Sequence, residues 1–251
     1  MYSEATHCPG CPLKGKDTGD PVGPERHASD RFIVLGEAPG VHETIEGRPF
    51  VGPSGLELQK ALDAVGIPRS ACHITNVLCC RPHKNDLEAL NTRILRRNRQ
   101  LAREEKPLIS RPVEACQGRL YTELATTGIT DILCLGKTAV KAIKGGDPSI
   151  MGIRGGCEEI PAPWNPKVTL KIGYLLHPAS VLRMQAFREV FQHDLRKAFR
   201  FFQGKLDWVE PKITVTNDPG EVKRILRRFE AQSLPVAYDV ETDSIDPMTA
   251  H

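Results

Sequence analysis

The sequence predicts an α/β fold in which a central, mostly parallel sheet is flanked by helices. Short apolar segments rich in β-branched residues alternate along the chain with segments of helical periodicity. This alternation is typical of parallel strands joined by helical crossovers. Three of the apolar segments also end at Gly or Pro, residues that stop a strand. In the first 204 residues we expect four strands, over residues 31–36, 73–80, 131–136 and 168–178.

The helices are expected from their caps and from the spacing of apolar residues. Ser54 and Glu57 form a capping-box pattern that opens a helix, and Gly66 ends it. A short helix over 137–143 follows the third strand. A long helix over 180–202 carries Phe and Leu close to every fourth position. Each of these helices presents one apolar face, as packing on a sheet requires.

Length and composition are those of an ordinary globular protein. The chain has 251 residues, 40% of them hydrophobic, and its net charge of +3 is too small to indicate nucleic-acid binding by itself. No apolar run approaches the ~20 residues that a membrane span needs. The first residues, MYSEATHCPG, lack the pattern of a secretory signal. We therefore expect a monomer in a bacterial or host cytoplasm, with no membrane association.

Cysteines are the first sign of a special site. In a reducing compartment, clustered cysteines bind metal or do chemistry more often than they form disulfides. The chain has eight, of which only Cys8 and Cys11 form a C-x-x-C pair. No strand precedes this pair, so a thioredoxin-like redox motif is disfavoured. The pair favours half of a zinc or iron–sulfur site, with two more thiolates supplied from further along the chain.

Polar residues follow or end the predicted strands. Glu37 comes directly after the first strand, Asn76 lies in the second, and His177 lies at the end of the fourth. A Gly/Pro-rich loop after the first strand also carries Phe50. Ligands of parallel α/β sheets bind outside the carboxyl ends of the strands, so these residues are expected to share one crevice. Taken singly, a strand-end histidine or a phenylalanine is more often core packing.

Three motifs carry a resemblance to a known family. The segments GEAPGVHETIEGRPFVGPSG, ITNVLCCRP and HPASVLR resemble the motifs of the uracil-DNA glycosylase superfamily, and most closely its iron–sulfur family 4 type. The resemblance covers about residues 8–200. It implies a [4Fe–4S] cluster held by four cysteines, which match Cys8, Cys11, Cys80 and Cys116. Cys79 leaves an ambiguity of one residue, and the alignment to "CRP" favours Cys80.

The resemblance also implies roles in the pocket. Phe50 stacks on a uracil that has been flipped out of the DNA, and the amide of Asn76 pairs with the uracil O4 and N3–H. His177 donates to uracil O2 and stabilises its developing negative charge. Glu37 positions the attacking water. Glu43 is the second carboxylate and is expected beside the uracil C5 edge.

DNA contacts are implied on both sides of this pocket. Backbone N–H groups of Gly52 and Ser54, at a helix start, are expected to bind phosphate. The loop that includes Ser180, Leu182 and Arg183 resembles one that enters the minor groove, with Leu182 as the wedge and Arg183 on a phosphate. Uracil-containing DNA is therefore the expected partner.

The stretch 93–106 departs from the family pattern. The gap between Cys80 and Cys116 is longer than the family leads us to expect, so this stretch resembles an insertion. It contains six Arg or Lys and two Glu. A solvated helix face is the simpler interpretation, and a phosphate-contacting surface is the alternative.

The C-terminal segment gives a separate indication. We expect a glycosylase-like domain over 1–204, a linker over 205–210 and part of a second domain over 211–251. In that second part, strands are expected over 212–217 and 234–244, and between them a helix opens with Asp218, Pro219 and Glu221 in capping-box register. The last segment resembles the start of the 3′–5′ exonuclease domain of family A DNA polymerases, with Asp239 and Glu241 in its first metal-binding motif. A solvated strand face would also explain these carboxylates. The resemblance implies further polymerase or exonuclease domains in a longer parent chain, of viral or other origin.

The sequence therefore favours a uracil-DNA glycosylase. The alternative is a non-catalytic module of a replicative polymerase that senses uracil or DNA. Glu37, Asn76 and His177 are all present, and a pure binding module would not require all three. A nuclease is disfavoured because the other metal-binding carboxylates are absent from this sequence.

Overall fold

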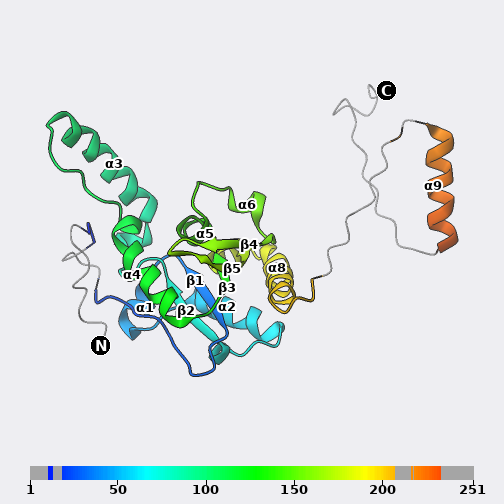
Figure 1. Ribbon diagram of the computed structural model, residues 1–251, viewed down its shortest axis with the longest axis horizontal. Helices are drawn as coiled ribbons and strands as arrows, with labels where there is room; N and C mark the ends of the chain where they lie inside the picture. The colour runs from blue at the N-terminus through cyan, green and yellow to red at the C-terminus, as the bar shows by residue number, and fades with distance from the viewer. Residues whose placement is uncertain (1–10, 14–18, 207–215, 217, 233–251) are drawn as a thin grey trace. The chain divides into compact units, whose positions relative to one another are not determined.

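The computed structural model describes residues 11–13, 19–206, 216 and 218–232 (Figure 1). The chain divides into two compact units, Met1–Leu206 and Asp207–His251, and each is described by itself. No helix among the described residues is long and apolar enough to cross a membrane.

The first unit is built on a five-stranded sheet with the strand order β2-β1-β3-β5-β4. The strands are β1 (Phe32–Gly36), β2 (Cys72–Asn76), β3 (Asp131–Leu135), β4 (Cys157–Ala162) and β5 (Asn165–Leu175). Neighbouring strands are parallel except for β4, which pairs antiparallel with β5. The predicted α/β fold with a mostly parallel sheet is confirmed.

Helices cover both faces of this sheet (Figure 1). The helices of the first unit are α1 (Val41–Glu46), α2 (Pro53–Ala64), α3 (Leu87–Arg103), α4 (Pro112–Thr127), α5 (Lys137–Lys144), α6 (Ile150–Ile153), α7 (Pro178–Arg183) and α8 (Phe187–Phe202). Side chains of α4 and α5 pack in one core cluster with Ile33 and Leu35. Side chains of α2 and α8 pack in a second cluster with Phe32 and Val34. Successive residues of β1 thus point to opposite faces, as a strand between two helical layers requires.

The strands differ from the expected ones in two places. β4 is a strand that the sequence does not predict. Its two adjacent glutamates, followed by Ile-Pro-Ala, lack a clear alternation of polar and apolar residues. Charged residues and Pro161 are tolerated there because β4 lies at the edge of the sheet. β2 ends at Asn76 and not at residue 80. After Asn76 the chain still runs beside the end of β1, because Val77 N donates to Gly36 O at 3.0 Å and Leu78 N donates to Glu37 O at 2.9 Å.

Two predicted helices also needed correction. The helix expected to open at Ser54 begins at Pro53, with Gly52 at the N-cap and no capping side chain. Glu57 binds Lys60 and Arg188 in place of the expected capping box.

The helix expected over 180–202 is two helices, α7 and α8, because Met184 between them has an extended backbone (φ −143°, ψ 103°). Val181 of α7 still packs in the same core cluster as α8. Leu182 of α7 is 40% exposed, whereas Phe191 and Leu195 of α8 are buried in the core.

The described part of the second unit is α9 (Pro219–Gln232). It begins where the sequence predicts, and the Asp218 carboxylate accepts a hydrogen bond from Gly220 N at 2.9 Å. Glu221, the expected second member of the capping box, pairs with Arg224 instead. Asp239 and Glu241 lie outside the described residues, as do nearly all residues of the two strands expected on either side of α9. The boundaries of the second domain thus stay a prediction.

Candidate active site

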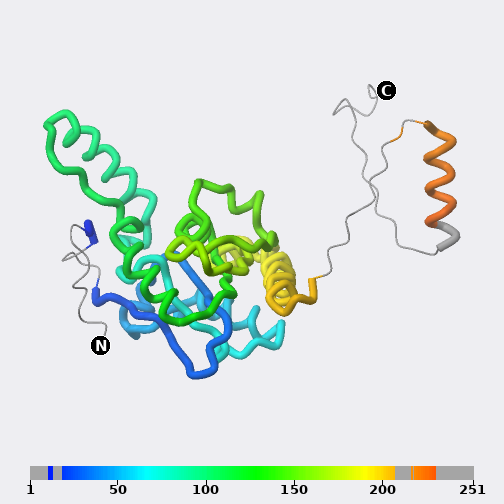
Figure 2. Tube along the Cα trace, in the orientation of Figure 1, coloured from blue at the N-terminus to red at the C-terminus, as the bar shows by residue number. Residues whose placement is uncertain are grey.

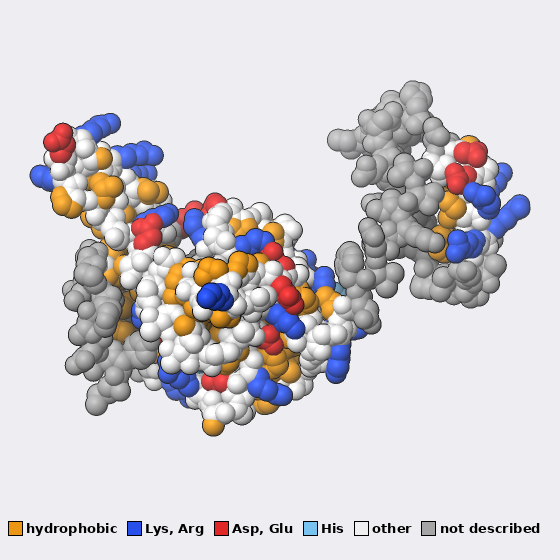
Figure 3. Space-filling model, viewed as in Figure 1, with side chains coloured by type: hydrophobic (Ala, Val, Ile, Leu, Met, Phe, Trp, Pro, Cys, Tyr) orange, Lys and Arg blue, Asp and Glu red, His pale blue; other side chains and the backbone are white. Residues whose placement is uncertain are grey.

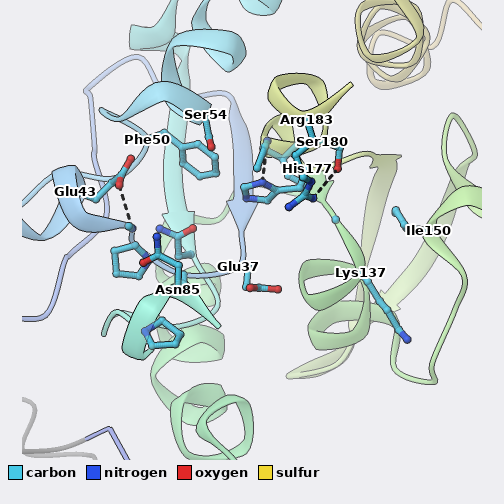
Figure 4. A pocket seen from close by; sticks show the side chains of 18 residues that line it. Glu37, Glu43, Phe50, Ser54, Asn85, Lys137, Ile150, His177, Ser180 and Arg183 are labelled. Atoms are coloured by element: carbon cyan, nitrogen blue, oxygen red, sulfur yellow. Dashed lines mark hydrogen bonds between the residues drawn. The ribbon is translucent and has the colours of Figure 1, made fainter. Parts of the chain in front are cut away.

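One cavity of about 460 Å³ lies at the carboxyl ends of the parallel strands (Figure 4). Glu37, Phe50, Asn76 and His177 all line it. They come from the ends of β1, β2 and β5 and from the loop between α1 and α2. Residues predicted for other roles also line it, namely Glu43, Ser54, Ser180 and Arg183. The expected convergence at the sheet edge is therefore present in the structure.

Asn76 is the most deeply placed polar group of the cavity. It ends β2 beside Gly36 of β1 and is only 6% exposed. Its Oδ1 atom is buried and has no hydrogen-bond partner among the described residues. A Cβ atom at Gly36 would lie 2.4 Å from Asn76 Oδ1 and 2.4 Å from Phe50 Cζ, so only glycine fits there. An unpaired buried acceptor of this kind is costly unless a ligand supplies the donor.

Phe50 is held in an uncommon backbone conformation. Its φ of 52° is left-handed, which is unfavourable for a bulky residue. Two hydrogen bonds from Arg69 hold the loop, to Pro49 O at 2.8 Å and to Phe50 O at 3.3 Å. A Cβ atom at Gly55 would lie 1.9 Å from Phe50 O, so α2 also has to approach this loop as bare backbone.

Arg69 depends in turn on a buried carboxylate. Its Nε and Nη2 atoms donate to Glu25 at 2.8 and 3.0 Å. Burial alone would raise the pKa of Glu25, but hydrogen bonds from Arg69, His27 and Arg48, together with the charge of Arg69, hold it at about 2. The charge pair is therefore intact at neutral pH. Nothing local in the sequence indicated it, because 44 positions separate the two residues.

His177 follows β5 and caps the start of α7. Its Nδ1 atom accepts a hydrogen bond from Ala179 N at 3.2 Å, and its ring lies 5.9 Å from that of Phe50. Burial lowers the pKa of His177 to about 4, and the positive charge of Arg183 adds to that effect. The imidazole is therefore neutral at pH 7. Because Nδ1 accepts, the proton is on Nε2, where it can be donated to a ligand.

Glu37 lies at the rim shared by two cavities. It lines the first cavity and also a neighbouring one of about 710 Å³. Thr138, in the first turn of α5, donates a hydrogen bond from its hydroxyl to Glu37 Oε2. The other carboxylate oxygen is left to face solvent or substrate. Thr138 was not among the predicted site residues, because the segment LGKTAV gives no sign that its hydroxyl reaches β1.

Glu43 organises the loop around the cavity. Its carboxylate accepts hydrogen bonds from the backbone N–H groups of Gly40, Val51 and Gly52 at 3.0, 3.1 and 2.8 Å. Because the Gly52 N–H is already used, it does not fit the expected role of binding phosphate. Of the two residues predicted for that role, only Ser54 in the first turn of α2 remains.

The predicted DNA-contacting residues of α7 lie at the mouth of the cavity. Arg183 donates to Ser180 Oγ at 3.4 Å, and both residues line the cavity (Figure 4). Leu182 and Met184 are exposed apolar residues beside them, at 40% and 54%. An exposed apolar residue next to an arginine is suited to contact bases and phosphates together.

Comparison with known proteins agrees with this geometry. Residues 24–203 match the family model of the uracil DNA glycosylase superfamily. The chain belongs to this superfamily. The match includes all the cavity residues described above. It ends before residue 211, so it has no bearing on the resemblance to an exonuclease.

Several relatives in this superfamily are similar over most of their length. The type-4 uracil-DNA glycosylase of Pyrobaculum aerophilum is 35% identical over 82% of this chain and 94% of its own. That of Archaeoglobus fulgidus is 30% identical over 78% of this chain and 89% of its own. That of Thermotoga maritima is 31% identical over 78% of this chain and 90% of its own.

Cys79 and three of the predicted iron ligands belong to or pack against one core cluster, although no three His, Cys, Asp or Glu side chains among the described residues are placed to hold a metal ion. Cys11, Cys79 and Cys116 are buried in one apolar cluster, and Cys80 packs against it partly buried. These four residues come from three segments distant in sequence. The thiol of Cys79 forms a hydrogen bond with Cys116, and this contact and burial raise the pKa of Cys116. Cys8 lies outside the described residues.

Helix α4 connects Cys116 to the backbone beside the cavity. Arg119, one turn after Cys116, donates to Asn76 O at 2.8 Å and to Val77 O at 2.6 Å. It also forms an ion pair of 2.8 Å with Glu123. Glu123 is in contact with His73 of β2 at 3.0 Å. The carbonyl of Asn76 is thus fixed by the helix that carries a predicted cluster ligand.

Proposed function

We propose that the chain hydrolyses the N-glycosidic bond of uracil in DNA. The observation that carries this proposal is the buried Asn76 amide, whose Oδ1 has no partner among the described residues. It faces the same cavity as the neutral imidazole of His177 and the ring of Phe50. Family membership and the similarity to type-4 uracil-DNA glycosylases support the same activity.

Recognition follows from the donor and acceptor pattern of the base. A base inside a duplex must be flipped out before it can enter a closed pocket. Uracil offers an N3–H donor and an O4 acceptor, which match the oxygen and nitrogen of the Asn76 amide. Cytosine offers the reverse pattern and would leave both groups unpaired. The flipped base stacks on Phe50, and Glu43 holds the surrounding loop through its three backbone hydrogen bonds.

The reaction separates charge along the glycosidic bond. When the bond between C1′ and N1 breaks, its electron pair moves into the uracil ring and partly onto O2. His177 donates its Nε2–H to that oxygen and stabilises the negative charge, as an oxyanion-hole donor does. A water held by Glu37 attacks C1′ and gives up its proton to the carboxylate. Thr138 fixes the other oxygen of Glu37 and so sets the direction of the free one.

We infer a [4Fe–4S] cluster held by Cys8, Cys11, Cys80 and Cys116. The proposal is supported by the described members of this set, because Cys11 and Cys116 belong to one core cluster and Cys80 packs against it, and by the similarity to type-4 uracil-DNA glycosylases. When bound, the cluster would join these segments without taking part in hydrolysis. Cys79 lies beside Cys116 and is the other candidate for the third position.

We also propose, from sequence resemblance alone, that residues 211–251 begin a 3′–5′ exonuclease domain of a longer polymerase chain. With only Asp239 and Glu241 of its metal site, this segment should not degrade DNA. Truncation after about Gly204 should leave uracil excision intact. Metal-dependent trimming of 3′ ends that is lost in Asp239→Ala would refute this interpretation. A monomeric cytoplasmic protein stays the expectation.

The test of the main proposal is direct. The chain is incubated with single- and double-stranded oligonucleotides that contain one uracil, and alkali then cleaves the abasic sites formed. Matched oligonucleotides with thymine or cytosine at that position are the controls. We expect release of uracil alone. Tight binding of uracil-containing DNA without release would contradict the proposal and favour the sensing module.

A further inference from the structure

The segment 87–111 projects from the first unit as a helical arm (Figures 1 and 2). It consists of α3 and the chain that returns along it to α4, and we call it the basic arm. Asn98 joins its two halves, because its amide donates to Ile109 O at 2.8 Å and accepts from Ile109 N at 2.9 Å. The arm is therefore a single helix, α3, with a non-helical return segment that is fixed to it.

The arm has one apolar face and one basic face. Leu87, Ile94 and Leu101 are buried and recur every seven residues, so they lie on one side of the helix. At 3.6 residues per turn, four exposed arginines fall on the opposite side. They are Arg93, Arg96, Arg99 and Arg103. Figure 3 shows blue basic side chains on this projecting part of the surface.

The arm carries the net positive charge of the whole chain. It contains seven Arg or Lys and three Glu, a net charge of +4, whereas the complete chain has +3. The remaining residues together therefore have a net charge of −1. The four arginines of the basic face form no ion pair or hydrogen bond with the residues that the structure describes. Their charge is thus available to a ligand.

The arm begins at the proposed active site. Asn85, just before it, lines the catalytic cavity, and Leu87 lines the neighbouring one. At ~1.5 Å per helical residue, Arg93 lies roughly 9 Å and Arg103 roughly 24 Å along the axis from Leu87. The arginines thus span about 15 Å, the length of about four phosphates of one DNA strand. Their row starts near the place where the flipped nucleotide would enter.

We propose that the basic face of the arm binds the phosphate backbone of DNA that flanks the flipped uracil. This proposal rests on the proposed function, because it assumes that uracil-containing DNA occupies the cavity. A polyanion fits better than a protein partner, since the face is formed of arginines without the apolar centre that protein interfaces have. Phosphate contacts add affinity without adding preference for a sequence.

The test removes the four charges and measures salt dependence. The variant Arg93→Gln/Arg96→Gln/Arg99→Gln/Arg103→Gln should keep its fold, because glutamine is a good helix former and all four sites are exposed. Circular dichroism checks this point. Binding to a uracil-containing duplex is followed by fluorescence anisotropy across a salt series. The slope of log K against log salt is negative, and each lost phosphate contact reduces its magnitude by ~0.9. The magnitude should therefore be smaller in the variant by up to about 3.6.

The same slope gives the expected change in affinity. Between about 50 and 200 mM salt, the wild-type chain should lose about 10²-fold more affinity than the quadruple Gln variant. Excision from a very short single-stranded oligonucleotide, which cannot reach the arm, should be the same for both proteins. Excision from a long substrate should show a raised KM in the variant and an unchanged kcat.

Two further variants serve as controls. A quadruple Lys variant at the same positions should keep the wild-type slope, because lysine retains the charge. The variant Lys223→Gln/Arg224→Gln/Arg227→Gln/Arg228→Gln removes the same charge from exposed positions of α9. It should also leave the slope unchanged. A wild-type slope in the arm variant, or an equal decrease in the α9 variant, would overturn the proposal.

Failure of this proposal and failure of the proposed function are distinguishable. If the wild-type chain releases no uracil from any substrate, the function is wrong. The anisotropy measurement would still report whether the arm binds DNA. If the chain excises uracil while the arm variant keeps the wild-type salt slope, only the role of the arm is wrong.

Discussion

Replacing Arg119 by Gln should strongly destabilise the fold around the proposed uracil-binding amide. The Arg119 side chain is 15% exposed and that of its partner Glu123 is 2% exposed. The change removes the ion pair and the bonds to Asn76 O and Val77 O, and it leaves the Glu123 charge buried. Loss of one partner from a buried pair typically costs ~3–5 kcal/mol. We expect a decrease of that size in the free energy of unfolding at pH 7.

The pKa of Glu123 gives an independent magnitude and a pH dependence. Burial raises this pKa, but His73, Arg119 and Thr75 together lower it from 4.5 to about 2. Such a difference corresponds to stabilisation on the order of 3 kcal/mol. Because the folded-state pKa is the lower one, this stabilisation is complete above pH 4.5 and is lost as the pH falls towards 2. The difference in the free energy of unfolding between Arg119→Gln and the wild type should therefore become smaller as the pH falls from 4.5 towards 2.

Urea unfolding of four proteins tests this reasoning. They are the wild type, Arg119→Gln, Glu123→Gln and the double variant, and the double variant should recover part of the loss because no buried charge remains unpaired. Arg111→Gln is the matched control, since Arg111 pairs with Glu114 on the exposed start of the same helix. It should change stability by less than ~1 kcal/mol. A similarly small effect of Arg119→Gln, or a loss that does not depend on pH, would refute the argument.

Three other predictions concern the cavity and the cysteines. Asn76→Ala should still fold and should slow uracil release ~10²-fold or more in single-turnover assays, and unchanged release would contradict its role. The free energy of unfolding of the wild type should decrease as the pH falls from about 6.5 to 4, because the folded-state pKa of His177 is about 4 and the buried ring stays neutral while the unfolded chain binds a proton. In His177→Gln this decrease should be smaller. An equal decrease in the free energy of unfolding of the wild type and His177→Gln over this pH range would contradict the prediction. Cys116→Ser should lose iron, brown colour and stability, and finding zinc without iron in anaerobically purified wild type would disprove the cluster.

The sheet and the position of the cavity were predictable because their signals are local. β1 is a short apolar run that ends at Gly36, Gly136 directly follows the apolar run of β3, and β5 contains an apolar run that is followed by Pro178. Parallel strands bring their carboxyl ends to one edge. Glu37, Asn76 and His177 could therefore be placed together before any contact was known.

The parts that could not be predicted depend on contacts between distant residues. Arg119 lies 43 positions from Asn76 and 42 from Val77, and no periodicity marks such a pair. The break at Met184 was hidden because the apolar spacing continues across it. Ser54 has a residue three positions on that suits a capping box, but Pro53 and Gly52 start the helix earlier.

The two arginine–glutamate pairs have corresponding roles in the backbone that surrounds the cavity. Arg69 donates to the carbonyls of Pro49 and Phe50, and Glu25 balances its charge. Arg119 does the same for the carbonyls of Asn76 and Val77, with Glu123 as its partner. The residue proposed to stack on the base and the residue proposed to read its polar edge are thus each fixed through their backbone.

This arrangement places the recognition groups before any substrate binds. A side chain fixed through its own backbone keeps its position without using atoms that the base has to contact. The Oδ1 of Asn76 is left unpaired for that reason, although an unpaired buried acceptor lowers stability. The hydrogen bonds that Arg69 and Arg119 donate to backbone carbonyls beside the cavity offset that loss of stability. Changes at Arg69 or Arg119 should therefore alter the preference for uracil more than the rate of bond cleavage, for which we propose that His177 and Glu37 are responsible.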